Sequence, residues 1–274
     1  MSGTKDKNGK RGDEAVQDSS GSRAPEERRA AALRLIMERS TAQVEELAAL
    51  LNVSRMTIHR DLDTLAEQGL VRRVRGGATA QPSVLFESNF FYRRALHADH
   101  KRSLATAVAR EIEPGKALVL DDSTTVDLIV PLLADRVPIT LITNAVEVMQ
   151  AARTIEGVNL IVLGGEYCPI FNALLGLVAE QGMTSMRADL LIMSASAVQG
   201  TVCFHQDQRV VRVKRAMMEA ADRRILVIDS SKFGKSALHR LADLSEFDAV
   251  YVDRALAASH AAPLEEAGIT LHRV

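Results

Sequence analysis

Short apolar runs alternate with amphipathic stretches from about residue 100 to residue 274, and this alternation restricts the fold more than any other feature. Each run is about four residues long, which suits a buried strand, whereas the stretches between the runs space their apolar residues as helices do. Such alternation forms a largely parallel sheet with helices on both faces. The predicted strands are Ala117–Leu120, Ile139–Ile142, Leu160–Leu163, Leu190–Met193, Ile225–Ile228, Ala249–Val252 and one near Ile269–Leu271. The predicted helices are Lys101–Ile112, Thr125–Leu133, Ala145–Ala152, Leu174–Ser185, Val210–Ala221 and Ala255–Ala267.

The segment before this α/β domain has the pattern of a small helical bundle followed by a β-ribbon. Helices are predicted over Pro25–Arg39 and Val44–Leu51, where apolar residues recur at helical spacing. A third helix is predicted to begin after Ser54, a suitable N-cap, and to end at Gly69. Residues 70–77 then form a predicted ribbon that carries three arginines and no acidic residue. This order of elements is that of a winged helix-turn-helix, with the ribbon as the wing.

These patterns divide the chain into four parts. Residues 1–25 are predicted to be a disordered tail, because they can bury too little apolar surface to offset the entropy of ordering. Residues 26–80 are the predicted winged helix-turn-helix, residues 81–98 a linker, and residues 99–274 the α/β domain. Two folded domains suit a chain of 274 residues.

Composition argues against several classes of protein. No apolar run reaches about 18 residues and the first residues are polar, so we expect no membrane span, no secretory signal and a cytoplasmic location. Cys168 and Cys203 are expected to be free thiols. His97 and His100 have no Cys or His cluster near them, so we expect no metal and no cofactor. The net charge of −1 does not by itself indicate a nucleic-acid partner.

The third predicted helix has one apolar and one basic face. If Ile58, Leu62 and Leu65 turn towards the bundle, the opposite face is free to enter the major groove of DNA. Arginine can pair with the acceptor edge of guanine, and hydroxyl groups suit phosphate or base contacts. A solvated helix face would contain similar residues, so this interpretation depends on the order of the elements. The candidate DNA-binding residues are Ser54, Arg55, Thr57, His59, Arg60, Arg72, Arg73 and Arg75.

Polar or glycine-rich loops follow three successive predicted strands, at the end where parallel sheets bind ligands. Hydroxyl groups and the free N–H groups at the start of a helix can bind a phosphate or the hydroxyl groups of a sugar. The loops are Asp121-Asp122-Ser123-Thr124-Thr125, Thr143-Asn144 and Gly164-Gly165. The sequence therefore predicts a small-molecule site at this edge of the sheet.

Residues 43–78 (QVEELAALLNVSRMTIHRDLDTLAEQGLVRRVRGGA) resemble the N-terminal half of the DeoR family of bacterial regulators. The pieces V-x-E-L-A-x-x-L-x-V-S, T-I-x-R-D-L and L-x-x-x-G-L-V-x-R-x-x-G-G-A stand in the family's order and spacing. His59 stands where the family more usually has arginine. The resemblance continues to about residue 254, over a C-terminal domain that in this family is related in fold to ribose-5-phosphate isomerase.

This resemblance implies that the C-terminal domain senses a phosphorylated sugar. It also implies that Lys214, together with Asp229 and Lys232 of a D-x-S-K-F-G motif, lies in the pocket. The chain departs from the family pattern at three positions. Ser123 replaces a glycine, Cys168 a basic residue and Val210 an acidic residue, so we expect a shifted or altered effector preference.

We therefore predict a homo-oligomeric DNA-binding transcriptional regulator, a repressor of carbohydrate-metabolism genes, whose affinity for double-stranded operator DNA depends on a phosphorylated sugar. Two alternatives remain open. One is a sugar-phosphate isomerase-like enzyme with a fused DNA-binding head, which would need a base carboxylate within reach of a substrate proton. The other is a DNA-binding protein whose C-terminal domain only oligomerises.

Overall fold

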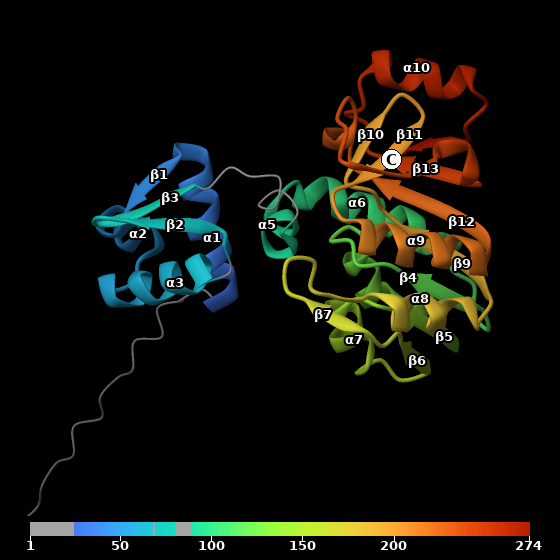
Figure 1. The fold of residues 1–274 in the computed structure, drawn as a ribbon, viewed down its shortest axis with the longest axis horizontal. Helices are drawn as coiled ribbons and strands as arrows, with labels where there is room; N and C mark the ends of the chain where they lie inside the picture. Colours follow the sequence, from blue (N-terminus) through green and yellow to red (C-terminus); the bar gives the residue numbers. More distant parts are fainter. Residues whose placement is uncertain (1–24, 68, 81–88) are drawn as a thin grey trace, which may run out of the picture.

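Figure 1 shows the chain, in a computed structural model, as a small N-terminal module followed by a larger C-terminal domain. The structure describes residues 25–67, 69–80 and 89–274. The predicted tail therefore lies outside the described residues except for Pro25, as do residues 81–88 of the predicted linker. The N-terminal module contains helices α1 (Pro25–Arg39), α2 (Val44–Leu51) and α3 (Arg55–Glu67), and strands β1 (Thr41–Gln43), β2 (Val71–Val74) and β3 (Gly77–Ala80).

The three helices of the N-terminal module pack around one apolar core. The core side chains come from the helix faces that the apolar spacing predicts. They include Leu33 and Ile36 on α1, Leu47 on α2, and Ile58 and Leu62 on α3, all of them buried. The prediction that α3 turns its apolar face towards the bundle is therefore confirmed.

The turn between α2 and α3 is tight and capped. Asn52 ends α2 with a φ of 52°, a left-handed conformation that asparagine adopts more readily than most residues. The Oγ atom of Ser54 then accepts a hydrogen bond from the backbone N–H of Thr57, at 3.1 Å. This bond satisfies one of the free N–H groups at the start of α3, so Ser54 is the N-cap that the sequence predicts.

The wing belongs to a three-stranded antiparallel sheet with the order β1-β3-β2. The sequence did not reveal β1, because three residues are too few to show an alternating pattern. The pairing of β3 with β1 explains Gly77, where a Cβ atom would lie 2.2 Å from the carbonyl oxygen of Ala42. The wing is thus held against the helices through β1.

The C-terminal domain is built on a seven-stranded parallel sheet with the order β15-β14-β12-β9-β4-β5-β6. Its strands are β4 (Ala117–Leu120), β5 (Ile139–Thr143), β6 (Val158–Val162), β9 (Ala188–Met193), β12 (Ala221–Ile228), β14 (Ala249–Val252) and β15 (Leu271–Arg273). Helices α6 (Ala98–Val108), α7 (Val146–Ala152), α8 (Leu177–Thr184), α9 (Gln208–Ala220) and α10 (Ala258–Glu266) accompany them. The predicted α/β architecture is therefore confirmed.

The strand order of the parallel sheet reverses beside β4. Strands β5 and β6 lie on one side of β4, whereas β9 and the strands that follow it lie on the other. In doubly wound sheets a crevice opens at such a reversal, outside the carboxyl ends of the strands. Leu120 of β4 pairs with Thr143 of β5 and with Ile192 of β9, so the loops after these three strands meet at one edge.

One predicted helix has a different form in the structure. The segment Thr125–Leu133 was predicted to be α-helical, but residues Asp127–Arg136 form the 3-10 helix η2. Pro131 lies inside η2. Proline lacks the N–H donor that an α-helix interior needs, and its ring clashes with the preceding turn, which accounts for the difference.

Short antiparallel strands were also missed. The predicted helix Leu174–Ser185 begins later than expected, because residues 173–175 form β8 and α8 starts after Gly176, whose φ is 91°. Strand β8 pairs with β7 (Glu166–Cys168). A separate small sheet contains β10 (Ala197–Gln199), β11 (Val202–His205) and β13 (His239–Asp243).

A short helix, α5 (Phe90–Ala95), lies within the predicted linker. Tyr92 of α5 packs against the core of the N-terminal module. Phe90 is buried, and its N–H donates to the carbonyl oxygen of Ile170 in the C-terminal domain, at 2.8 Å. This part of the predicted linker is therefore a helix in contact with both parts of the molecule, and Figure 1 shows it between them.

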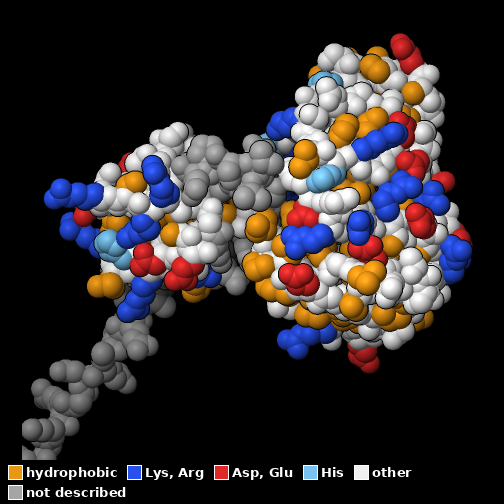
Figure 2. Space-filling view, in the orientation of Figure 1, with side chains coloured by type: hydrophobic (Ala, Val, Ile, Leu, Met, Phe, Trp, Pro, Cys, Tyr) orange, Lys and Arg blue, Asp and Glu red, His pale blue; other side chains and the backbone are white. Residues whose placement is uncertain are grey.

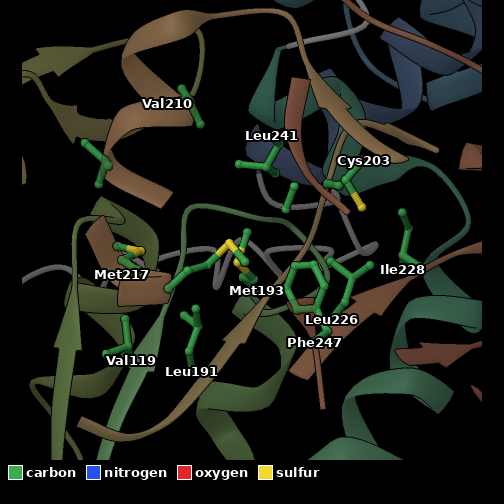
Figure 3. Packing of buried hydrophobic residues seen from close by; sticks show 14 of the residues in the cluster. Val119, Leu191, Met193, Cys203, Val210, Met217, Leu226, Ile228, Leu241 and Phe247 are labelled. Atoms are coloured by element: carbon green, nitrogen blue, oxygen red, sulfur yellow. The ribbon is translucent and has the colours of Figure 1, made fainter. Parts of the chain in front are cut away.

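One face of the parallel sheet packs against α9 and the small antiparallel sheet. Figure 3 shows Val119, Leu191 and Leu226, from three neighbouring strands, in the same cluster as Val210 and Met217 of α9. All five side chains are buried. This packing positions α9, and with it Lys214, over the carboxyl ends of the strands.

Candidate DNA-binding surface and ligand site

The outer face of α3 is exposed. The side chain of Arg55 is 71% exposed, and His59 and Arg60 also face solvent. The Nη1 atom of Arg55 lies 3.5 Å from Oε1 of Glu45 on α2. An exposed ion pair of this kind contributes at most about 1 kcal/mol, so the guanidinium can exchange Glu45 for another anionic partner.

The inward side of α3 carries a buried ion pair. Nε and Nη2 of Arg28 on α1 donate to Oδ2 and Oδ1 of Asp61, at 2.6 and 3.1 Å. Asp61 is 3% exposed, and the hydrogen bond from Arg28 to Asp61 raises the pKa of Arg28. The aspartate in the T-I-x-R-D-L motif therefore holds α3 against α1, while the preceding Arg60 points outward.

The three arginines of the wing have different surroundings. Arg72 and Arg75 are exposed. Arg73 instead contacts α3, with Nε 3.1 Å from Oδ1 of Asp63 and Nη2 2.8 Å from Nδ1 of His59. Adjacent residues of a strand point to opposite faces, which explains why Arg72 and Arg73 differ. Arg73 thus links the wing to α3.

Charges of both signs cover the N-terminal module. Figure 2 shows arginine side chains over the side of the module that faces away from the C-terminal domain, with acidic side chains beside them. Residues 26–80 contain nine arginines and eight acidic residues. A surface of mixed charge produces little long-range attraction for a polyanion, so the direction in which individual arginines point matters more than the net charge.

A buried lysine holds two aspartates together where β4 ends. Nζ of Lys214 donates to Oδ2 of Asp121 and to the carbonyl oxygen of Ser194 (3.2 Å), and lies 3.1 Å from Oδ1 of Asp122. Burial alone would lower the pKa of Lys214, but the two aspartates raise it. The same pairing outweighs burial at Asp122 and lowers its pKa. Two of the three N–H groups of Lys214 therefore donate to the protein, and its charge also lies beside Asp122.

The loop after β4 is organised by its own polar groups. Oδ1 of Asp121 accepts from the N–H of Ser123 (3.1 Å), and Oδ2 accepts from the N–H of Ser194 (2.9 Å). Oγ of Ser123 accepts from the N–H of Val126 at 3.3 Å. Ser123 is not among the described residues with positive φ, so a serine fits in place of the glycine without backbone strain. Thr124 and Thr125 are buried in the same loop.

Thr143 and Asn144 are buried where β5 ends. Oγ1 of Thr143 donates to the carbonyl oxygen of Leu120 (2.7 Å) and accepts from the N–H of Ala145 (3.0 Å), so it fixes β5 to β4. Nδ2 of Asn144 donates to the carbonyl oxygen of Leu174 at 3.2 Å. Its Oδ1 makes no hydrogen bond with any described residue. A buried acceptor without a donor costs about 1–3 kcal/mol, which a ligand hydroxyl group would offset.

Gly164 and Gly165 lie at the end of β6 and are exposed. Gly165 has a φ of 138°, and a Cβ atom there would lie 2.4 Å from the carbonyl oxygen of Leu175. The close approach of the β7-β8 hairpin therefore requires glycine at this position. The same hairpin contains Cys168, whose Sγ lies 3.7 Å from Nη2 of Arg209. The guanidinium of Arg209 on α9 thus lies beside Cys168, the position at which the family pattern has a basic residue.

The turn after β12 is fixed from two directions. Oδ1 of Asp229 accepts hydrogen bonds from the N–H and the hydroxyl group of Ser231. Asp253, after β14, accepts from the N–H (2.6 Å) and the hydroxyl group (2.9 Å) of Ser230. Lys232 is half-buried in this turn. Asp253 was not among the predicted site residues.

Sequence reasoning also missed a buried lysine at this edge. Nζ of Lys101, on α6, donates to Oγ1 of Thr124 (3.0 Å) and to the carbonyl oxygen of Arg93 on α5. Burial lowers the pKa of Lys101 to about 7, with attraction from Asp229 opposing this change and repulsion from Lys232 and Arg93 adding to it. Lys101 opens an amphipathic helix in the sequence, where lysine is ordinarily a surface residue.

Arg93 was missed for a different reason, because it lies in the predicted linker. Burial lowers its pKa, against the attraction of Asp122 and Asp121. His205 of β11 is buried in the same region, and burial followed by repulsion from Lys214 lowers its pKa to about 3, so it is neutral at pH 7. The edge of the sheet thus combines cations and carboxylates from α5, α6, α9, β4 and β12.

Sequence models of known protein families match both parts of the molecule. A sequence model of the DeoR-like helix-turn-helix domain matches residues 28–84. A model of the DeoR C terminal sensor domain matches residues 96–254, more than half of the chain. The chain belongs to the DeoR family. It is a DNA-binding transcriptional regulator, and the resemblance stated from the sequence is confirmed.

Curated relatives of this DeoR family regulator match over most of their lengths. An L-fucose operon activator of Haemophilus influenzae is 33% identical over 82% of this chain and 90% of its own length. A glycerol-3-phosphate regulon repressor of Escherichia coli is 32% identical over 81% of this chain and 88% of its own length.

Solved structures resemble this DeoR family regulator only distantly. Ribose 5 phosphate isomerase A from Neisseria gonorrhoeae has a TM-score of 0.37 and 11% identity, over 51% of this chain and 55% of its own. Separately, none of the helices in the described part of the chain has both the length and the apolar character needed to cross a bilayer.

Proposed function

We propose that this regulator represses carbohydrate-metabolism genes and that a phosphorylated sugar, bound at the carboxyl ends of the central strands, controls its affinity for operator DNA. One observation carries the sensing part of the proposal. Buried cations from α6 and α9 and buried carboxylates from the loops after β4 and β12 converge where the strand order reverses, the position at which doubly wound sheets bind ligands. Burying a charged group without a partner is unfavourable. Clusters of buried charged groups with shifted pKa values are therefore found mainly at functional sites.

For DNA, we propose that α3 enters the major groove. Its exposed Arg55, His59 and Arg60 would face base edges, where each good bidentate contact of an arginine contributes about 1–3 kcal/mol of discrimination. Ser54 and Thr57, at the start of α3, would contact phosphate. On the wing, Arg72 and Arg75 would contact the flanking backbone or the minor groove, while Arg73 would position the wing through His59 and Asp63.

For the effector, we propose a division of labour at the sheet edge. Lys232 would bind the phosphate group, and Asp122 and Asn144 would accept hydrogen bonds from sugar hydroxyl groups. Lys214 would serve as the buried counter-ion of Asp121 and Asp122, because it donates to Asp121 and lowers the pKa of Asp122. The names of two relatives, which refer to L-fucose and to glycerol 3-phosphate, support a sugar or polyol phosphate.

We also propose a homo-oligomer that works in the cytoplasm, where bacterial DNA lies. One winged module covers too few base pairs for strong operator binding, and pairs of modules match pairs of half-sites. We propose no catalytic step. A general base needs a carboxylate that is free to take a proton, whereas both oxygens of Asp121 and one of Asp229 already accept hydrogen bonds from the protein. Asp122 is a weak base, because Lys214 beside it lowers its pKa. A turnover assay with pentose and hexose phosphates tests this point.

The experiment that tests the proposal is fluorescence anisotropy with the DNA upstream of the protein's own gene, titrated with a panel of sugar phosphates. We expect specific binding that one member of the panel weakens by about 5-fold to 150-fold, the usual range of coupling between two sites. Arg34→Ala, an exposed arginine on α1, is the control for Arg60→Ala on α3. Equal affinity for the upstream DNA and for random DNA would contradict the operator assignment, and indifference to every sugar phosphate would contradict the sensor assignment.

A further inference from the structure

The helix α5 contacts both functional parts of the molecule within six residues. On one side, Tyr92 packs against the core of the N-terminal module. On the other, Phe90 is hydrogen-bonded to Ile170, and Nε of Arg94 lies 3.5 Å from Oδ2 of Asp127 in η2. Because these contacts all lie within about one and a half turns of a single helix, a displacement of α5 at one of them also displaces the others.

The same helix contributes directly to the ligand site. Arg93 is attracted electrostatically by Asp122 and Asp121 at the end of β4. Its carbonyl oxygen accepts a hydrogen bond from Nζ of Lys101, and Lys101 also donates to Thr124 in the loop after β4. Arg93 and Lys101 thus join α5, α6 and the loop after β4 through one chain of polar contacts.

We propose, on the basis of the proposed function, that Arg93 and Lys101 bind the phosphate group of the effector, and that α5 transmits occupancy of the site to the DNA-binding module. Neither residue belongs to the strand-end motifs that indicate the site in the sequence. The chemistry of the pair suits a phosphate anion. The ammonium of Lys101 has one N–H group beyond those that donate to Thr124 and to the carbonyl oxygen of Arg93, and a guanidinium offers a planar fork for phosphate oxygens.

Charge explains why a dianion would change this site. Burial does most to lower the pKa of Lys101, and repulsion from Lys232 and Arg93 lowers it further. A bound phosphate dianion would replace this repulsion with attraction and would compete with Asp122 for Arg93. Any resulting shift of Arg93 would also shift Tyr92, which lies next to it on α5 and packs on the other domain. A ligand that makes different contacts in two conformational states of a protein shifts the equilibrium between those states.

Binding of the anionic group is tested with inorganic phosphate and with glycerol 3-phosphate as probes, by calorimetry on the full chain at pH 6.5. We expect Lys101→Met and Arg93→Gln each to weaken binding at least tenfold, and Lys101→Arg to restore most of it. Arg102→Gln is the matched control, because Arg102 follows Lys101 on α6 but is exposed, and its binding should equal that of the unmodified chain. Circular dichroism melting establishes that each variant is folded.

Transmission is tested with Tyr92→Ala. We expect this variant to bind glycerol 3-phosphate within about twofold of the unmodified chain, while the effect of the ligand on operator affinity falls to less than a third. If Lys214→Met abolishes phosphate binding but Lys101→Met and Arg93→Gln do not affect it, the site is right and the roles of these two residues are wrong. If Tyr92→Ala responds fully, α5 is not the transmitting element. If the unmodified chain binds neither probe nor any sugar phosphate, the proposed function fails together with this inference.

Discussion

Replacement of Lys214 by methionine is the sharpest test of how the strand-end site is built. The change keeps most of the side-chain volume and removes one buried charge, leaving the carboxylates of Asp121 and Asp122 without their counter-ion. Breaking a buried pair by removing one partner typically costs about 3–5 kcal/mol, because the remaining charge stays buried.

The pH dependence of the loss follows from the direction of these pKa changes. In the unmodified chain, Lys214 lowers the pKa of Asp122, so the stabilisation is present at neutral pH and is lost only as pH falls through that lowered pKa. In the variant, burial without the counter-ion raises the pKa of Asp122, so the folded state takes up a proton as pH falls from 7.5 towards 5.5. We therefore expect the deficit of Lys214→Met to be largest at pH 7.5 and to shrink at pH 5.5.

Urea denaturation followed by circular dichroism measures this deficit. Lys116→Met is the matched control, because Lys116 also pairs with an aspartate of the C-terminal domain, Asp189, but at the surface. We expect no resolvable change in its unfolding midpoint. The double variant Asp121→Asn with Lys214→Met should recover part of the loss, because it buries one uncompensated charge fewer. A deficit below about 1 kcal/mol at pH 7.5, or an equal deficit at both pH values, would refute the reasoning.

Four further results are expected. Arg60→Ala should weaken operator binding about tenfold or more in an anisotropy assay and change stability by less than about 1 kcal/mol, because the residue is exposed; unchanged affinity would contradict the placement of α3 in the groove. Asp61→Ala should destabilise the N-terminal module by about 3–5 kcal/mol in thermal melts, since it leaves Arg28 buried without its carboxylate, whereas the exposed neighbour Asp63→Ala should cost far less. Lys232→Ala should keep operator affinity and lose the response to the effector, and a normal response would exclude it from the site. Affinity for a sugar phosphate should fall as pH rises from 6.5 to 8.5, because Lys101, whose pKa is about 7, loses its positive charge over this range. The groups that act on Lys101 are Arg93, Asp229 and Lys232. Calorimetry should find a much smaller fall in affinity for Lys101→Arg.

The elements that periodicity predicts best are those whose burial is one-sided and local. The bounds of α2 and β4 agree with prediction because apolar residues at fixed spacing specify which face is buried, whatever the rest of the chain does. Prediction was wrong for η2, where Pro131 interrupts the helical hydrogen bonds. Strand β1 was not predicted, because its three residues are too few to show an alternating pattern and the strand is stabilised by pairing with β3.

The residues of the candidate site were likewise only partly predictable from the sequence. The loops after β4 and β5 could be located from the sequence, because the carboxyl ends of parallel strands must meet at one edge. Arg93 and Lys101 could not, since their burial exists only once α5 and α6 have folded over that edge. Lys214 was placed in the pocket by family resemblance, but only the structure reveals that it donates to Asp121 and Ser194 and lies beside Asp122.

The amino-acid sequence alone determined the two-part architecture, the apolar face of α3, the order of strands along the chain and the family. These features depend on residue types and on their spacing within short stretches of the chain. Tertiary structure decided which charges are paired, which are buried and which face solvent. Lys214 meets Asp121 across 93 positions of the chain, and such long-range contacts carry no local periodicity, so their energies become visible only in the folded molecule.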